Sequence, residues 1–235
     1  MTYQQTNRLQ DYCSSLVDTI RENGGNRPIV LFDTAAVIDF EKKIRESRLK
    51  DKQSDSATFY NHLGHFLHHC FVPHGISKEI EKHTHCKVSG IPEISAPCKF
   101  VMDTLNFNFS SLMNRTDLGN LDPEKLRYDV WCASLLAFRD SGQYGTIKNK
   151  TLRKKSISDP ISGPDRELVS SGLLFALSKP HFPVDTVEET LPSTGVVIVS
   201  PDIHVRETVK VLTDCHPNVE ELYGYRGLKT ISSEQ

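Results

Sequence analysis

Four carboxylates in this chain of 235 residues stand where a short apolar segment ends or where a helix is expected to begin. Crowded carboxylates repel one another and raise one another's pKa, so proteins keep such groups together mainly around a divalent cation. Hard cations such as Mg²⁺ and Mn²⁺ prefer oxygen ligands. A carboxylate-bound cation can form hydroxide and stabilise the leaving oxygen of a phosphate ester. If the four acids meet, we therefore expect hydrolysis of a phosphodiester. The four are Asp33, Glu79, Asp165 and Asp202.

Two of these acids each follow an apolar run that predicts a β-strand. Asp33 ends the segment 28–33 in "RPIVLFDTAAVIDF", and Asp202 ends "GVVIVSPD" at 195–202. The continuous apolar run of the second segment is typical of a central parallel strand. In open α/β sheets, sites form outside the carboxyl ends of the strands, so we expect both acids at one edge. Asp33 alone has a structural alternative, because an aspartate there can also N-cap the following helix.

The other two acids are expected in the early turns of helices. Glu79 lies in "ISKEIEKHTH" at 76–85, after the apolar segment "CFVP". Asp165 opens a helix over 163–179, which has proline in its first turn. Helix starts that follow or precede parallel strands fall at the same edge as the strand ends. All four carboxylates are therefore expected on one side of the molecule.

Three further acids were weighed for roles at this site. Asp129 competes with Asp165 as the third acid, because it also starts an apolar helix. We prefer Asp165, since its helix is expected to lead directly into the strand at 195–202. Glu167 and Asp39 are candidates for a supporting role beside the four principal acids.

The remaining segments alternate between helices and strands, which indicates an α/β fold with a parallel sheet. The helices between the second and third strands predict a helical insertion at about 87–145, not a separate domain. We expect an N-terminal helix within 1–26, a main domain over 27–214 and a C-terminal extension over 215–235. Further helices are expected at 6–23, 35–49, 56–70, 97–114, 123–141 and 203–214, and further strands at 70–73 and 221–227.

Taken in order, these segments resemble the four acidic blocks of PIN-domain nucleases. The resemblance covers most of residues 27–214 and implies a three-layer α/β/α fold with extra helices. It also implies a Mg²⁺- or Mn²⁺-dependent ribonuclease site in which the four acids are metal ligands. Thr34 and Ser200 occupy the hydroxyl positions of the first and last blocks, where they would steady a ligand or a metal-bound water. The matching segments are "IVLFDTAAVIDF", "FVPHGISKEIEKH", "GPDRELVSSGLLFAL" and "VVIVSPD".

A run of basic residues, "KNKTLRKKS" at 148–156, lies shortly before Asp165. Such runs are usually solvated loops. Here the run could also contact RNA phosphates, which position a substrate without reading its sequence. The two interpretations weigh about evenly. The basic residues are Lys148, Lys150, Arg153, Lys154 and Lys155.

The bulk composition excludes several classes of protein. A net charge of −2 provides no overall basic field, so any contact with nucleic acid must come from a local patch. No apolar run approaches the ~20 residues that span a bilayer, and the polar N-terminal segment lacks the apolar core of a signal peptide. The six cysteines occur without a C-x-x-C pair, which indicates reduced thiols. We therefore expect a cytoplasmic protein that makes no membrane contact.

Two other functions stay open on the sequence alone. The first is a PIN-like module that has lost catalysis and binds RNA or another protein. The extra helices favour a protein partner or a homodimer under either interpretation. The second is a phosphatase with Asp33 as nucleophile. That chemistry usually uses a second aspartate two residues later, which acts as the acid. Position 35 is Ala35, and this feature argues against the phosphatase.

Overall fold

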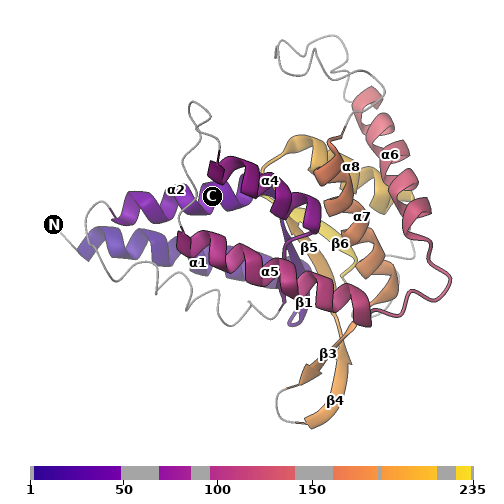
Figure 1. The fold of residues 1–235 in the computed structure, drawn as a ribbon, viewed down its shortest axis with the longest axis horizontal. Coiled ribbons are helices and arrows are strands. Elements are labelled where there is room, and N and C mark those ends of the chain that lie inside the picture. The colour runs from indigo at the N-terminus through magenta and orange to yellow at the C-terminus, as the bar shows by residue number, and fades with distance from the viewer. Residues whose placement is uncertain are drawn as a thin grey trace.

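Four parallel strands form the central sheet of the computed structural model, in the order β2-β1-β5-β6. Figure 1 labels β1, β5 and β6 of this sheet. The strands are β1 (Pro28–Phe32), β2 (Cys70–Phe71), β5 (Gly195–Val199) and β6 (Leu228–Ile231). Every residue of β1 and β5 is buried, as the continuous apolar runs of these segments predict. The structure describes residues 3–48, 69–85, 96–140, 161–184, 187–215 and 226–233.

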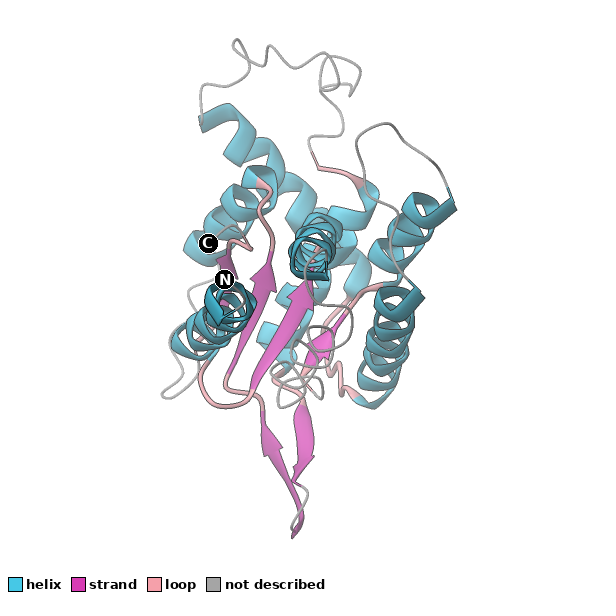
Figure 2. Ribbon diagram, turned by 90° about the vertical axis from the view of Figure 1, so that its left-hand side faces the viewer, coloured by secondary structure: helices cyan, strands magenta, loops and turns pink. Residues whose placement is uncertain are grey.

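Helices cover both faces of this sheet, an arrangement compatible with three layers (Figure 2). On one face, Phe32 of β1 contacts Phe40 of α2 with ring centroids 5.4 Å apart, and Phe40 in turn contacts Tyr12 of α1. On the other face, α7 lies against β5. The helices are α1 (Tyr3–Gly24), α2 (Thr34–Arg48), α4 (His74–His85), α5 (Ala96–Arg115), α6 (Pro123–Asp140), α7 (Gly163–Ser178) and α8 (Ile203–Cys215).

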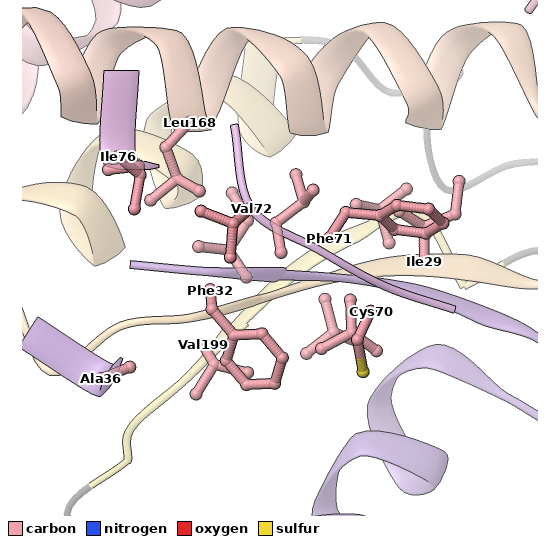
Figure 3. Close-up of a cluster of buried hydrophobic side chains, with 14 of the residues drawn as sticks. Ile29, Phe32, Ala36, Cys70, Phe71, Val72, Ile76, Leu168 and Val199 are labelled. Atoms are coloured by element: carbon pink, nitrogen blue, oxygen red, sulfur yellow. The ribbon is translucent and has the colours of Figure 1, made fainter. Parts of the chain in front are cut away.

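The core continues through the sheet on both of its faces. Figure 3 shows Ile29 and Leu168 on the side of α7, and Phe32 and Val199 on the opposite side. This alternation follows from the two-residue period of a strand. Gly172 brings α7 close to the sheet, because a Cβ there would lie 2.9 Å from Cδ1 of Ile198. Each fully buried large apolar side chain contributes about 1.5–3 kcal/mol to folding.

The side of the sheet to which the chain proceeds reverses between β1 and β5. From β1 it passes through α2 to β2 on one side, and from β5 it passes through α8 to β6 on the other side. The two strands pair in register, with Phe32 opposite Val199. Their carboxyl ends therefore lie at the topological switch point, where sites in open α/β sheets form.

The order of elements confirms most of the expected strands and helices. The expectation that the helix at 163–179 leads directly into β5 was wrong, because an antiparallel hairpin of β3 (His181–Val184) and β4 (Val187–Pro192) lies between them. Pro180 and Pro183 obscured this hairpin, since proline weakens a strand prediction. The hairpin projects from the end of the sheet opposite the carboxyl ends of the strands (Figure 2).

The two ends of the chain contribute to the same sheet. The N-terminal helix α1 packs against β1, β5 and β6, and the hydroxyl of Tyr12 donates to the carbonyl of Ser233 at 3.1 Å. The segment expected as a C-terminal extension supplies the edge strand β6, which begins just beyond the expected 221–227. The expected helix at 56–70 lies almost wholly outside the described residues.

None of the helices in the described ranges combines the length and the apolar character that a membrane crossing requires. Four cysteines whose side chains are described carry free thiols. They are Cys13, Cys70, Cys132 and Cys215.

Candidate active site

Asp33 is the most buried of the four predicted acids, with 3% of its surface exposed. It follows β1 directly, and its backbone N–H donates to the carbonyl of Val199 at the end of β5, at 3.1 Å. The hydroxyl of Ser200, which is fully buried, donates to Oδ2 of Asp33 at 2.5 Å. A carboxylate therefore sits at the switch point between the two central strands and accepts a hydrogen bond from the serine that directly follows β5.

Asp33 also has the position of a helix cap. Its carbonyl accepts the N–H of Val37 at 3.1 Å, and the backbone N–H of Thr34 lowers the pKa of its carboxyl. The structural alternative raised by the sequence is therefore compatible with a role in chemistry, since one carboxylate can cap α2 and still face the edge of the sheet.

The carboxyl of Asp33 has a strongly raised pKa. The pKa of its carboxyl is raised from 3.8 to about 7, mainly by burial and in addition by the charges of Asp165 and Asp202, while the hydrogen bond from Ser200 opposes the rise. Desolvation and like charges both disfavour a carboxylate, which explains the direction of the shift. The charges of two further predicted acids thus act on Asp33 at the carboxyl edge.

Asp202 and Asp33 are joined through the hydroxyl of Ser200. The N–H of Asp202 donates to Oγ of Ser200 at 3.1 Å, while that hydroxyl donates to Asp33. Oδ1 of Asp202 accepts the N–H of His204 at 2.8 Å, which caps the start of α8. Ser200 therefore fixes the spacing between the ends of β1 and β5.

Glu79 reaches the same edge through Thr34. The hydroxyl of Thr34 donates to Oε2 of Glu79 at 2.8 Å, and Thr34 is the residue that follows Asp33. Thr34 is buried and Glu79 half-buried. The two hydroxyl residues singled out in the sequence, Thr34 and Ser200, thus each hydrogen-bond a different predicted acid.

Asp165 is fixed at the start of α7 by Ser162. Oγ of Ser162 accepts the N–H of Asp165 at 3.2 Å and donates to Oδ2 of the same residue at 2.5 Å. Sequence reasoning missed Ser162, although serine three residues before an acid is a recognised sign of a helix start.

Glu167, one of the supporting acids, joins the starts of two helices. Its Oε2 accepts the N–H of Gly75 at 2.9 Å, at the beginning of α4. A carboxylate is favoured there because the open N–H groups of a helix start carry partial positive charge. A Cβ at Gly75 would displace this carboxylate and lie 3.3 Å from the Cα of Pro164, so glycine favours the close approach of α4 and α7. Glu167 therefore helps to position the helices that carry Glu79 and Asp165.

Asp39 and Asp129, the other two acids considered from the sequence, lie on α2 and α6. Asp39 pairs with Lys42 at 3.3 Å and accepts the hydroxyl of Ser233 at 3.0 Å, so its partners lie on α2 and beyond β6. Asp129 is half-buried on α6. The basic run at 148–155 lies outside the described residues.

The donor atoms suit a hard cation, because the groups at this edge are carboxylates and hydroxyls. In the part of the chain that the structure describes, no three histidine, cysteine, aspartate or glutamate side chains are close enough together to hold one metal ion. Mg²⁺ commonly binds through one or two carboxylates and keeps several waters, so a site with fewer direct protein ligands stays open. Asp33 and Asp202 are the pair most directly linked. Convergence of all four acids on one cation stays a prediction.

Comparisons with models of known protein families, with curated proteins and with solved structures find no match for this chain. The resemblance to PIN-domain nucleases remains a prediction from the sequence. The arrangement of Asp33, Ser200 and Asp202 at the switch point is therefore the basis for assigning a function.

Proposed function

We propose that the protein is a divalent-metal-dependent endoribonuclease of the PIN-like type, acting in the cytoplasm. One observation carries the proposal: a buried aspartate and a second aspartate follow the two central parallel strands at the switch point and share one serine hydroxyl. The order of the acidic segments in the sequence supports the same class of enzyme.

In this proposal Asp33, Glu79, Asp165 and Asp202 hold Mg²⁺ or Mn²⁺, directly or through water. The cation supplies a water of lowered pKa and stabilises charge on the phosphate. Ser200 keeps the carboxylate of Asp33 oriented, and Thr34 does the same for Glu79. Glu167 positions the first turn of α7 against α4.

RNA is the proposed substrate, held in part by the basic run before α7. Lys148, Lys150, Arg153, Lys154 and Lys155 would contact phosphates and leave the chemistry unchanged. Replacing all five with glutamine should weaken binding of single-stranded RNA and flatten its salt dependence.

The test is cleavage of a labelled single-stranded RNA by the full-length protein in Mg²⁺ and in Mn²⁺. Asp33→Asn and Asp202→Asn should each lower the rate by about a hundredfold or more, since metal-held charge stabilisation contributes several kcal/mol. Asp214→Asn, at the exposed far end of α8, is the matched control and should cut like wild type. Wild-type protein that binds RNA and never cuts it would reject the enzyme.

That rejection would favour the alternative, a PIN-like module that binds RNA or a protein partner without catalysis. One observation supports this alternative: within the described ranges, no three potential ligands are close enough together for one metal ion. The module predicts that Asp33→Asn and Asp202→Asn leave RNA affinity unchanged and that neither Mg²⁺ nor Mn²⁺ affects the protein.

A further inference from the structure

One face of α6 carries a row of polar and aromatic side chains that the proposed site does not use. They are spaced at i, i+3, i+4 and i+7, so they lie on one side of the helix. The rings of Tyr128 and Trp131 have centroids 5.7 Å apart and planes inclined by 33°. Tyr128 is 61% exposed, although tyrosine usually buries its ring. The row consists of Glu124, Arg127, Tyr128 and Trp131.

This face and the first turn of α7 line a pocket of about 710 Å³. The two helices are neighbours in Figure 1 and pack against each other. The volume falls within the range of small-ligand sites, about 300–1,000 Å³. Arg166 and Glu167 form the wall that α7 contributes. Two aromatic rings and two guanidinium groups therefore line the same space.

The two carboxylates in this pocket already have partners. Glu124 pairs with Arg127 at 3.0 Å, and both side chains are well exposed, so this pair contributes little and Arg127 can exchange it for another anion. Glu167 is turned toward the N–H of Gly75. An incoming phosphate can therefore contact Arg127 and Arg166, while a planar ring can stack on the aromatic pair.

The pocket also lies beside the predicted acids. Arg166 and Glu167 directly follow Asp165 in the first turn of α7, and the charge of Asp165 acts on Asp33. An RNA strand that reaches the carboxyl edge of the sheet can thus continue across the start of α7 into the pocket.

We propose that the α6–α7 pocket binds a nucleotide of single-stranded RNA adjacent to the cleaved phosphodiester. The base stacks on Tyr128 and Trp131, and a phosphate contacts Arg127 and Arg166. This inference rests on the proposed ribonuclease function, for which it names the substrate site. Stacking on aromatic rings accepts any base and requires an unpaired one, so the pocket selects single strands with little sequence preference.

Binding can be measured without cleavage, because EDTA removes the cation. Trp131 is the single tryptophan of the chain, so its fluorescence reports on this pocket alone. Hexauridylate added to the full-length protein should quench that emission. The anisotropy of fluorescein-labelled hexauridylate gives the affinity. Tyr128→Ala should weaken binding about tenfold, as expected for loss of one stacked base.

Matched variants show whether a loss of RNA affinity comes from lost stacking or from the removal of any exposed side chain. Tyr128→Phe keeps the ring and should bind nearly as well as wild type. Phe107→Ala removes another exposed ring, 73% exposed on α5, and should leave affinity unchanged. Arg127→Gln should weaken binding and reduce its salt dependence. Circular dichroism and the melting temperature show that each variant is folded.

Unchanged Trp131 emission, or equal affinity in wild type and Tyr128→Ala, would overturn the pocket assignment. The cleavage assay in Mn²⁺ tests the enzyme separately. RNA cleavage with normal Tyr128→Ala affinity would reject the pocket and keep the nuclease. Tyr128-dependent binding without any cleavage would keep the RNA site and reject the nuclease.

Discussion

At the amino edge of the sheet, where β1 and β5 begin, the polar contacts are made by backbone groups, one threonine hydroxyl and the guanidinium groups of Arg27 and Arg226, which donate to backbone carbonyls. Oγ1 of Thr194 donates to the carbonyl of Gly24 at 2.6 Å and accepts the N–H of Arg27 at 2.9 Å. At the carboxyl edge, where the same two strands end, a carboxylate is buried instead. Asp33 is 3% exposed, and the charges of two further acids act on it.

The difference between the two edges indicates that the amino edge stabilises the fold and that the carboxyl edge is suited to chemistry. The hydrogen bonds of Thr194 at the amino edge join neutral groups, satisfy partly buried backbone groups and stabilise the fold. The buried carboxylate at the carboxyl edge opposes folding when it is ionised, because burial raises its pKa. Groups that lower stability and gather at a switch point are expected where a protein binds or reacts.

The largest expected effect is a pH-dependent gain in stability from Asp33→Asn. The pKa of Asp33 is raised from 3.8 to about 7 in the folded chain. The folded state therefore binds the proton more tightly, and wild-type stability falls as pH rises from about 4 through 7. Above pH 7, Asp33→Asn should be more stable by up to about 4 kcal/mol in EDTA, because each pKa unit corresponds to 1.36 kcal/mol. Urea unfolding between pH 4 and 8 measures this.

The control for this experiment is Asp214→Asn, whose curve should run parallel to that of wild type. Near pH 4 the Asp33→Asn variant and wild type should converge, since Asp33 is then protonated in the folded chain. A difference that stays constant between pH 4 and 8 would show that Asp33 titrates normally, and the contrast between the two edges would be lost.

The second effect is stabilisation by a divalent cation at the carboxyl edge. A cation that binds only the folded chain adds about 2.7 kcal/mol at a hundred times its dissociation constant. Mn²⁺ at millimolar concentration should therefore raise the melting temperature of wild type. The rise should be smaller in Asp202→Asn, whereas Thr194→Ser at the amino edge should keep the full rise. An unchanged wild-type melting temperature would argue against the metal site.

At the amino edge, Thr194→Val should lower stability by about 1–3 kcal/mol, because it leaves the buried carbonyl of Gly24 and the N–H of Arg27 without their partner. The loss should be independent of pH and of Mn²⁺, since no titrating group is involved. Thr194→Ser keeps the hydroxyl and should restore most of the stability. RNA cleavage by folded Thr194→Val at 20 °C should match wild type, and a large loss of rate would show that the two edges are coupled.

The sequence was sufficient to predict the strands and helices that carry the acids, because β1, β5 and α7 have long apolar patterns bounded by clear start and stop residues. It was insufficient for the β3–β4 hairpin, where prolines hide the strand pattern, and for the edge strand β6, which has only four residues. The contact of Glu167 with Gly75 depends on how α7 packs against α4. The contact of Tyr128 with Trp131 depends on which side of α6 is exposed. Local patterns alone do not assign them a function.

The smallest effect, and the one that bears most directly on Asp33, is expected from Ser200→Ala. The hydroxyl of Ser200 donates to Asp33 at 2.5 Å and lowers the pKa of that carboxyl against the effect of burial. Without it, the pKa of Asp33 should rise above 7 by about one unit, since a hydrogen bond to a charged group contributes about 1.5–3 kcal/mol. The stability difference between Ser200→Ala and Ser200→Ala/Asp33→Asn should then develop at higher pH than the difference between wild type and Asp33→Asn. Ser162→Ala, which removes the hydroxyl from Asp165 instead, is the matched control and should leave the Asp33 transition near its wild-type pH. Ser162→Ala could instead shift the pH of the Asp33 transition as far as Ser200→Ala does. The acids would then titrate as one coupled group, and the contacts at the ends of β1 and β5 would not be sufficient to set the pKa of Asp33.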